Sequence, residues 1–394
     1  MSELHQTPSA ERTHIAFFGK RNVGKSSLVN AFTGQALSVV SAVKGTTTDP
    51  VSKAMELLPL GPVQIIDTPG FDDEGELGQL RVKRTQKVLE TADIAILVTD
   101  ASKTLDPEEK QLLELLRQKG MPYLLVRNKA DLATELPDDG ICTSALTGMG
   151  IHQLKEQAAA LLPQKSERKL IADLLQPTDT VVLVVPIDKA APKGRLILPQ
   201  QQAIRDILDA GASALVCRDT ELRQTMEKLN QPPRLVITDS QVFGKVSAVV
   251  PRQVPLTSFS IAMARYKGDL PLLTRGVRAV DVLKTGDRVL ICEGCTHHRQ
   301  CEDIGTVKLP NRIRRHTGQE PEFIFTSGKD FPEKLTDVRL VIHCGGCMLT
   351  EKAMETRLNQ CQAQGIPVTN YGVLLAYFNG ILDRALEPFT QVSD

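Results

Sequence analysis

The sequence has little aromatic character, no net charge and no long apolar segment. Aromatic residues make up 4% of the chain, and 47 basic residues balance 47 acidic ones. A protein of this composition has no overall attraction for nucleic acid or for an anionic membrane surface. No apolar run approaches the roughly 20 residues that span a bilayer, and segment 1–14 lacks the apolar stretch of a signal peptide. We therefore expect a cytoplasmic protein with no nucleic-acid or membrane partner.

The cysteines are unevenly distributed. Five of the eight fall between positions 292 and 347. Structural disulfides are not expected in a reducing cytosol, so this clustering points to a metal or redox site. The other three, Cys142, Cys217 and Cys361, are expected to be packing residues.

Apolar strand patterns alternate with helical patterns along the chain, which indicates parallel sheets. Strands are expected at 14–19, 63–67, 94–100 and 123–128, then at 180–188, 213–218, 234–240 and 254–260, and finally at 287–294, 322–328, 338–346 and 367–372. We predict an α/β protein with a P-loop domain at 12–165, followed by two further α/β domains with mainly parallel sheets at 172–265 and 270–394.

A phosphate-binding loop follows the first strand. Gly19-Lys20-Arg21-Asn22-Val23-Gly24-Lys25-Ser26 fits G-x-x-x-x-G-K-[ST] between a strand and a helix. Backbone N–H groups of such a loop wrap phosphates at a helix N-terminus. Lys25 would reach the β- and γ-phosphates, and Ser26 would hold Mg²⁺. The nucleotide-binding residues predicted from this loop are Gly19, Asn22, Val23, Gly24, Lys25, Ser26 and Ser27.

Two further segments are expected around the phosphates and Mg²⁺. Asp67-Thr68-Pro69-Gly70 ends a strand, so Asp67 can join the Mg²⁺ shell and the Gly70 amide can sense the γ-phosphate. Segment 45–49 contains three threonines, of which Thr47 is the preferred Mg²⁺ ligand.

Base recognition is assigned to two later strand ends. Asn128-Lys129-Ala130-Asp131 places a carboxylate where it can accept both N–H donors of a guanine edge, an arrangement that adenine does not present. Ser144-Ala145 follows the next strand and could support the base. Together with the preceding motifs, this order and spacing favour GTP over ATP.

The motif set resembles the TrmE-Era-like GTPases over about residues 12–165. The residue after the DTPG segment is Phe71, where Ras-type enzymes have a glutamine that positions water. In similar GTPases with an apolar residue here, a potassium ion is held by the residue that corresponds to Asn22 and by the backbone of switch I, the segment that contains residues 45–49 in this chain. The resemblance implies potassium-stimulated GTP hydrolysis with Lys25, Asn22 and Gly70 as catalytic residues. The alternative for Asn22 is a loop-capping role.

Cysteines and histidines follow two strands of the last block. Cys292, Cys295 and His297 come after one strand, and His343, Cys344 and Cys347 come after another. The carboxyl ends of parallel strands are where α/β folds place ligands, and Gly345 and Gly346 let the backbone curl so that both sulfurs face one point. Four thiolates suit tetrahedral zinc or a 4Fe-4S cluster. From the ligand chemistry alone, both zinc and a 4Fe-4S cluster remain possible, with zinc slightly favoured.

Cys295-x-His297 followed by His343-Cys344-x-x-Cys347 resembles the signature of the HydF family, the GTPases that mature FeFe-hydrogenase. The resemblance covers the whole chain and implies a GTPase domain, a dimerisation domain at 172–265 and an iron–sulfur domain at 270–394. It also implies a 4Fe-4S cluster on Cys295, Cys344 and Cys347, with His297, His343 or Cys292 as the fourth ligand.

The same resemblance implies a homodimeric scaffold. Its transient cargo would be a diiron precursor assembled with the radical-SAM maturases HydE and HydG and delivered to apo FeFe-hydrogenase. Two alternatives from other classes remain: a ribosome- or RNA-associated GTPase with a zinc module, and a redox-regulated GTPase in which the cysteines act as a sensor.

Overall fold

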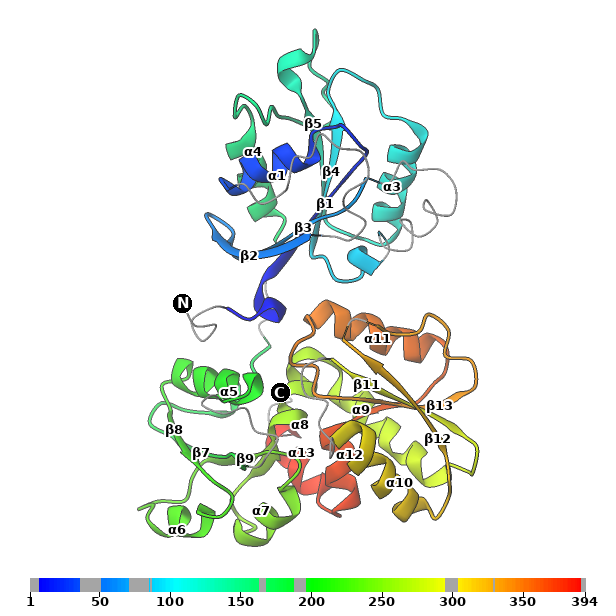
Figure 1. The fold of residues 1–394 in the computed structure, drawn as a ribbon. Coiled ribbons are helices and arrows are strands. Elements are labelled where there is room, and N and C mark those ends of the chain that lie inside the picture. The colour runs from blue at the N-terminus through cyan, green and yellow to red at the C-terminus, as the bar shows by residue number, and fades with distance from the viewer. Residues whose placement is uncertain are drawn as a thin grey trace. The chain divides into compact units, whose positions relative to one another are not determined.

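The computed structural model describes residues 7–35, 51–70, 85, 87–162, 168–187, 196–294, 304–328 and 330–390. The chain forms two compact units, Met1–Ser166 and Glu167–Asp394, and each is described by itself (Figure 1). Among the described residues, no helix is both long enough and apolar enough to cross a membrane.

The N-terminal unit is built on a sheet with the strand order β2-β3-β1-β4-β5-β6. The β2–β3 pair is antiparallel, and the other pairs are parallel. The strands are β1 (Thr13–Gly19), β2 (Val51–Leu57), β3 (Gly61–Asp67), β4 (Ile94–Asp100), β5 (Tyr123–Asn128) and β6 (Ile141–Cys142). The helices are α1 (Lys25–Thr33), α3 (Pro107–Gln118) and α4 (Ile151–Ala160), with short 3₁₀ turns at Ser9–Glu11 and Ala130–Leu132.

Helices cover both faces of this sheet because its central strands are apolar on both sides. Successive side chains of a strand point to opposite faces. Ile15 and Phe17 of β1 therefore pack with α1 and α4, whereas Ala16 and Phe18 pack on the opposite side with α3. Burial on both faces explains why β1 reads as a continuous apolar run rather than as an alternating one.

The C-terminal unit contains two parallel sheets, with the orders β10-β9-β7-β8 and β12-β11-β13-β14. The strands are β7 (Thr180–Val184), β8 (Ser213–Cys217), β9 (Leu235–Thr238), β10 (Leu256–Ser258), β11 (Arg288–Glu293), β12 (Glu322–Ser327), β13 (Val338–His343) and β14 (Val368–Asn370). The helices are α5 (Leu198–Asp209), α6 (Leu222–Glu227), α7 (Phe243–Val249), α8 (Phe259–Lys267), α9 (Leu270–Gly276), α10 (Leu309–Thr317), α11 (Glu351–Ala363), α12 (Tyr371–Phe378) and α13 (Leu382–Thr390). Short turns lie at Ala172–Leu174, Val277–Val282 and Ile304–Lys308.

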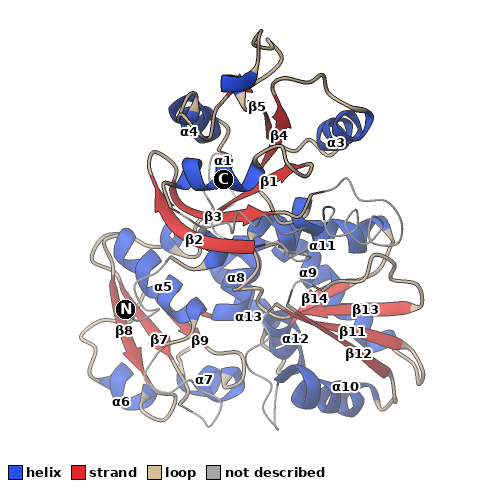
Figure 2. Ribbon diagram, turned by 45° about the horizontal axis from the view of Figure 1, so that its top comes forward, coloured by secondary structure: helices blue, strands red, loops and turns tan. Residues whose placement is uncertain are grey.

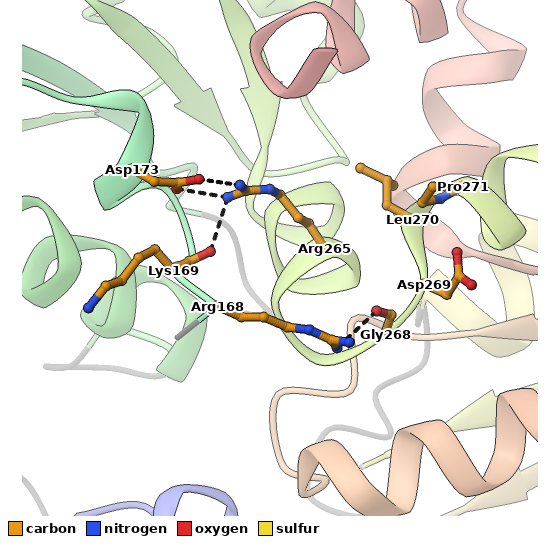
Figure 3. A pocket seen from close by; sticks show the side chains of 8 residues that line it. All are labelled: Arg168, Lys169, Asp173, Arg265, Gly268, Asp269, Leu270 and Pro271. Carbon is orange, nitrogen blue, oxygen red and sulfur yellow. Dashed lines mark hydrogen bonds and ion pairs between the residues drawn. The ribbon is translucent and has the colours of Figure 1, made fainter. Parts of the chain in front are cut away.

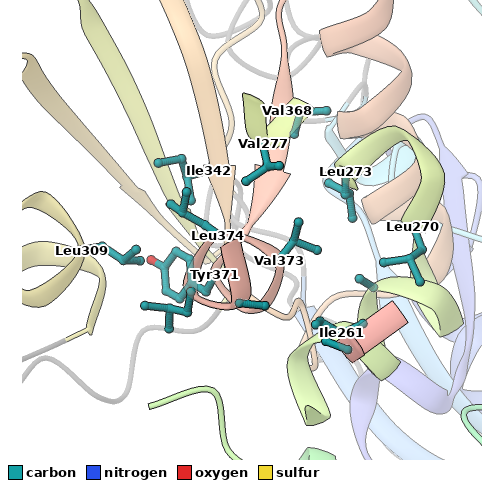
Figure 4. Close-up of a cluster of buried hydrophobic side chains, with 14 of the residues drawn as sticks. Ile261, Leu270, Leu273, Val277, Leu309, Ile342, Val368, Tyr371, Val373 and Leu374 are labelled. Atoms are coloured by element: carbon teal, nitrogen blue, oxygen red, sulfur yellow. The ribbon is translucent and has the colours of Figure 1, made fainter. Parts of the chain in front are cut away.

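Helices α8, α12 and α13 lie between these two sheets (Figure 2). A single hydrophobic core joins strands of both sheets with Ile261 of α8, Leu273 of α9 and Leu374 of α12 (Figure 4). A hydrogen bond connects helix α13 to the β10-β9-β7-β8 sheet, because the Thr257 hydroxyl of β10 donates to the carbonyl of Ala385 over 2.9 Å. The predicted boundary between residues 265 and 270 falls at the α8–α9 connection, and side chains from both sides of it share this core.

The predicted α/β class with mainly parallel sheets is confirmed. Strand β2, antiparallel at the edge of the first sheet, was not predicted. Several predicted strands are shorter than expected, and two of them lead directly into a helix. The chain leaves β10 at Ser258 and β14 at Asn370, and these two side chains cap the helices that follow by accepting from the backbone N–H of Ile261 and Val373. The third residue of a helix is where such a cap normally bonds.

Candidate nucleotide and metal sites

The phosphate-binding loop connects β1 to α1 and depends on close packing against neighbouring strands. A Cβ at Gly19 would lie 2.6 Å from the carbonyl oxygen of Val98, and a Cβ at Gly24 would lie 2.4 Å from Nδ2 of Asn128. Asn22 and Gly24 both have left-handed backbone conformations, with φ of 62° and 83°. Glycine is required at position 24 both by its φ and by this contact.

Three residues predicted to serve phosphate and Mg²⁺ converge at the start of α1. The ammonium of Lys25 forms an ion pair with Asp67 at the end of β3, and the hydroxyl of Ser26 donates to the other carboxylate oxygen over 3.1 Å. Thr68 is fixed to β1, because its hydroxyl donates to the carbonyl of Phe17 over 2.7 Å. The described segment ends at Gly70, and the predicted residues Thr47 and Phe71 lie outside the described residues.

Asn128 joins the phosphate loop to the segment that contains Ser144 and Ala145. Its side chain is 1% exposed, and its amide donates to the carbonyl of Val23 over 2.9 Å. Its amide oxygen accepts from the backbone N–H of Ala145 over 3.2 Å. Asn128 therefore holds two loops together from inside the fold, whereas Asp131 lies exposed on the turn after β5.

Lys129 is fixed to the preceding strand end. Its backbone has a left-handed φ of 62°, and its ammonium bonds Asp100 at 2.8 Å. Burial alone would raise the pKa of Asp100, but the hydrogen bonds from Lys129 and Ser102 lower it to about 2. Asp100 is consequently ionised throughout the neutral range and keeps Lys129 in place.

Lys20 is a site residue that the sequence motif did not single out. Its ammonium bonds Asp106 at 2.6 Å and also pairs with Glu108. Asp106 is the N-cap of α3, and its side chain accepts from the backbone N–H groups of Glu108 and Glu109. Burial would lower the pKa of Lys20, but these carboxylates raise it to about 12. The start of the loop is thereby attached to α3, a contact between distant segments that no local spacing reveals.

The second candidate site lies where β11 and β13 end side by side. The backbone N–H of Gly294 donates to Sγ of Cys344 over 2.9 Å, and that of Gly346 does so over 3.4 Å. A Cβ at Gly294 would be in van der Waals contact with the same sulfur, at 3.5 Å. The described end of the first cysteine segment, Gly294, therefore contacts the second segment at this sheet edge. Cys295 and His297 themselves lie outside the described residues.

The donor set around Cys344 and Cys347 fits a metal–thiolate site. Backbone N–H groups directed at a sulfur favour its ionised, ligating form and tune a bound metal. Burial raises the pKa of Cys347 to about 11, while the ammonium of Lys267 acts in the opposite direction. Within the described part of the chain, no three His, Cys, Asp or Glu side chains form a metal-binding group.

Cys292 and His343 pair in register on adjacent strands, β11 and β13. Cys292 is fully buried, and burial raises its thiol pKa to about 12. Burial, and then the charge of Arg357, lower the pKa of His343 to about 3, so its ring is neutral.

Both ring nitrogens of His343 are engaged. The guanidinium of Arg357 donates to Nε2 over 2.9 Å. Because Nε2 is the acceptor of a neutral ring, Nδ1 carries the proton. Nδ1 donates to the carbonyl of Cys344 over 3.3 Å. His343 therefore supports the backbone of the loop that carries Cys344 and Cys347, residues 344–350 between β13 and α11, called the cysteine loop below.

A pocket of about 500 Å³ lies on the surface of the C-terminal unit (Figure 3). Its lining residues are Arg168, Lys169, Asp173, Arg265, Gly268, Asp269, Leu270 and Pro271. Arg265 forms a two-point pair with Asp173, and Arg168 pairs with Glu351 at 3.0 Å. The two guanidinium groups thus pair with neighbouring carboxylates, and Arg168 also donates to the carbonyl of Gly268 after α8.

Family comparisons assign each part of the chain. Residues 14–129 match the family described as 50S ribosome-binding GTPase. Residues 170–268 match the Hydrogen maturase F dimerization domain, and residues 271–388 match the Hydrogen maturase F tetramerization domain.

Curated relatives match the N-terminal unit. The tRNA modification GTPase MnmE of Natranaerobius thermophilus is 35% identical over 168 residues, covering 42% of this chain and 36% of that protein. GTPase Der of Wolinella succinogenes is 39% identical over 135 residues, covering 34% of this chain and 28% of that protein. The chain thus spans about a third of the length of these relatives.

Among solved structures, Era of Aquifex aeolicus bound to GDP·AlF4⁻ has a TM-score of 0.34 and 20% identity, covering 52% of this chain and 93% of that one. The G domain of the T. maritima FeoB iron transporter has a TM-score of 0.31 and 26% identity, covering 39% of this chain and 99% of that one. These TM-scores are too low to support any argument about function.

The two glycines that bracket α1 allow a matched test of the contact between the phosphate loop and Asn128. Both have a positive φ, but a Cβ at Gly34 meets nothing within 4 Å. Gly34→Ala should destabilise the fold by about 1–2 kcal/mol and bind GDP like the wild type. Gly24→Ala should lose at least about tenfold in GDP affinity, because the added methyl displaces the loop from Asn128.

A fluorescence titration with N-methylanthraniloyl-GDP measures both variants. Equal affinities for Gly24→Ala and Gly34→Ala would show that the contact with Asn128 does not shape the nucleotide site.

Proposed function

Because this chain belongs to the hydrogen maturase F family, we propose that it is a GTP-hydrolysing scaffold that carries a 4Fe-4S cluster and delivers a diiron precursor to apo FeFe-hydrogenase. The observation that carries this proposal is the hydrogen bond from Gly294 to Cys344, which brings the two cysteine segments together. On this proposal the precursor is cargo, received with the radical-SAM maturases HydE and HydG, and the protein works in the cytoplasm.

For GTP hydrolysis we assign the converging residues of the first site. Lys25 would neutralise the β- and γ-phosphates, and Ser26, Asp67 and Thr47 would hold Mg²⁺, which neutralises the charge developing on the phosphates. The direct pair between Lys25 and Asp67 would then separate, because the ammonium turns to phosphate and the carboxylate turns to the metal. The Gly70 amide would report the γ-phosphate.

For guanine recognition we propose different roles for two residues of one motif. Asp131 is exposed and is proposed to accept the two N–H donors of the base. Asn128 is buried and keeps the loops in position. Lys129, Ser144 and the backbone N–H of Ala145 would flank the base.

For hydrolysis without a water-positioning glutamine, Asn22 is proposed to help bind a potassium ion beside the phosphates. Its left-handed backbone places an exposed side chain at the centre of the phosphate loop, where a monovalent cation can add positive charge to the transition state.

Hydrolysis should therefore be faster in potassium than in sodium, by about tenfold, which corresponds to about 1.4 kcal/mol of transition-state stabilisation. Phosphate release is measured in the two chlorides at matched ionic strength. Asn22→Ala should remove the difference while retaining slow hydrolysis in both salts. Equal wild-type rates in potassium and sodium would contradict the assignment of Asn22.

For the cluster we propose Cys295, Cys344 and Cys347 as ligands. A bound 4Fe-4S cluster would supply a redox-active iron site with one exchangeable position. Cys292 lies fully buried within β11, and both nitrogens of His343 are engaged. We therefore propose that these two residues support the loop and leave the fourth position to His297 or to an exchangeable group.

Iron analysis tests this ligand set. Anaerobically reconstituted protein should contain about four irons per chain, as one 4Fe-4S cluster requires. Cys344→Ser and Cys347→Ser should each lose the cluster, because each removes a thiolate. Cys292→Ser should retain it, as should the control Cys217→Ser on β8. Stoichiometric zinc without iron, in protein made anaerobically with abundant iron, would instead favour the zinc-module GTPase.

For self-association the edge of the first sheet of the C-terminal unit offers a surface. Strand β8 lies at this edge, and its Leu215 and Val216 are 37% and 45% exposed. An exposed apolar edge strand is a template for pairing with another strand. It lies within the match to a dimerization domain, so we propose that β8 pairs with β8 of a second copy.

A lysine on this strand should prevent the pairing, because an edge lysine would lose its hydration in the joined sheet. The Val216→Lys protein should be a monomer, with half the mass of the wild-type dimer, when light scattering is measured at micromolar concentration. The control Val282→Lys changes a residue that is 73% exposed on another part of the unit and should remain at least dimeric. A Val216→Lys protein with unchanged mass would place the interface elsewhere.

A further inference from the structure

A buried lysine from helix α8 supports the cysteine loop. Lys267 is the last residue of α8 and is 2% exposed. Its ammonium donates to the carbonyl of Cys347 and to the carbonyl of Leu349, each over 3.0 Å. Lys267 lies in the segment matched to the dimerization domain, while both carbonyls lie in the segment matched to the tetramerization domain.

The position of Lys267 is fixed from several directions. Side chains of α8 enter two different hydrophobic cores, with Ile261 in one and Met263 in the other. The amide of Asn370 donates to the carbonyl of Ser260 at the start of the helix over 3.0 Å. At its end, the guanidinium of Arg168 donates to the carbonyl of Gly268 over 3.4 Å (Figure 3). The packing and hydrogen bonds of α8 therefore hold the ammonium of Lys267 in a fixed position beside the loop.

A second buried cation lies at the other end of the same loop. Arg357 of α11 is 5% exposed and bonds Nε2 of His343 and the carbonyl of Gly328, with its guanidinium 5.2 Å from the Phe331 ring centre. Positively charged side chains therefore lie at both ends of the loop, Lys267 at the carbonyls of Cys347 and Leu349 and Arg357 at the ring of His343.

Two carbonyls could be held by a neutral amide at lower cost, because moving an ammonium out of water costs several kcal/mol. What the charge adds is electrostatic attraction for negative charge in a medium of low dielectric constant. Thiolate ligands and an added electron are both negative, and nearby charge is one of the factors that set cluster potentials.

We propose that Lys267 is a positioning residue for the metal site, which fixes the Cys347 backbone for ligation and whose charge stabilises the reduced form of the bound cluster. This inference rests on the proposed 4Fe-4S site. It makes Lys267 a determinant of the reduction potential rather than a ligand.

The test compares Lys267→Gln and Lys267→Arg in full-length, anaerobically reconstituted protein. Glutamine keeps a donor for the carbonyls without the charge, and arginine keeps the charge. Arg384→Gln is the matched control, since Arg384 also donates to buried-loop carbonyls, those of Ser247, Val250 and Pro251, but on helix α13. Iron content and a redox titration followed by electron paramagnetic resonance are measured for each.

Lys267→Gln should retain iron and become at least tenfold harder to reduce, a fall of about 59 mV for a one-electron couple. Lys267→Arg and Arg384→Gln should stay close to the wild-type potential. An unchanged potential in Lys267→Gln, or an equal fall in Arg384→Gln, would overturn the electrostatic role. If Lys267→Gln and Lys267→Arg both lose iron, Lys267 has only a packing role and the electrostatic proposal is wrong. Wild-type protein that binds no iron would instead refute the proposed function itself.

Discussion

The second site depends on the hydrogen bond from the backbone N–H of Gly294 to Sγ of Cys344. It joins two strand ends that are 50 residues apart in sequence, and it exists because β11 and β13 are parallel neighbours. Their carboxyl ends consequently reach the same sheet edge, where Cys292 and His343 are paired. Once this register is set, Gly294 at the end of one strand faces the loop that follows the other. The cysteine loop and the start of α11 take their places from that pairing.

Both sites use the same physical arrangement, in which a buried polar side chain holds strand-end loops that would otherwise be free to move. In the N-terminal unit Asn128 bonds the phosphate loop and the backbone N–H of Ala145. In the C-terminal unit Lys267 and Arg357 act on the cysteine loop and on His343. Unsatisfied buried polar groups are costly, so each such side chain makes one loop geometry much more favourable than its alternatives. A ligand then meets a preorganised loop and loses little free energy in ordering it.

The parallel sheets and the motifs at their strand ends were predictable because they rest on local signals. Short apolar strands and motifs at strand ends can be read from neighbouring residues. Helices α8 and α12 could not be predicted in this way. They are buried on nearly all sides, because α8 packs into two cores and α12 lies between two sheets. An all-round apolar helix has no 3.6-residue periodicity, so the strands predicted at 254–260 and 367–372 were extended over the first two residues of α8 and of α12. The contacts of Lys20 with Asp106 and of Lys267 with Cys347 depend on that packing and have no sequence signal.

The role of α8 has a thermodynamic consequence for the C-terminal unit. The helix belongs to the segment matched to a dimerization domain, yet its last side chain holds the loop that carries Cys344 and Cys347. Residues of both matched segments share one core, so a displacement of α8 changes the contacts of β13 and α11. If the proposed self-association through β8 shifts α8, the affinity of the cysteine loop for the proposed cluster changes with it. Linkage makes this coupling reciprocal, and metal binding then changes the free energy of association by the same amount.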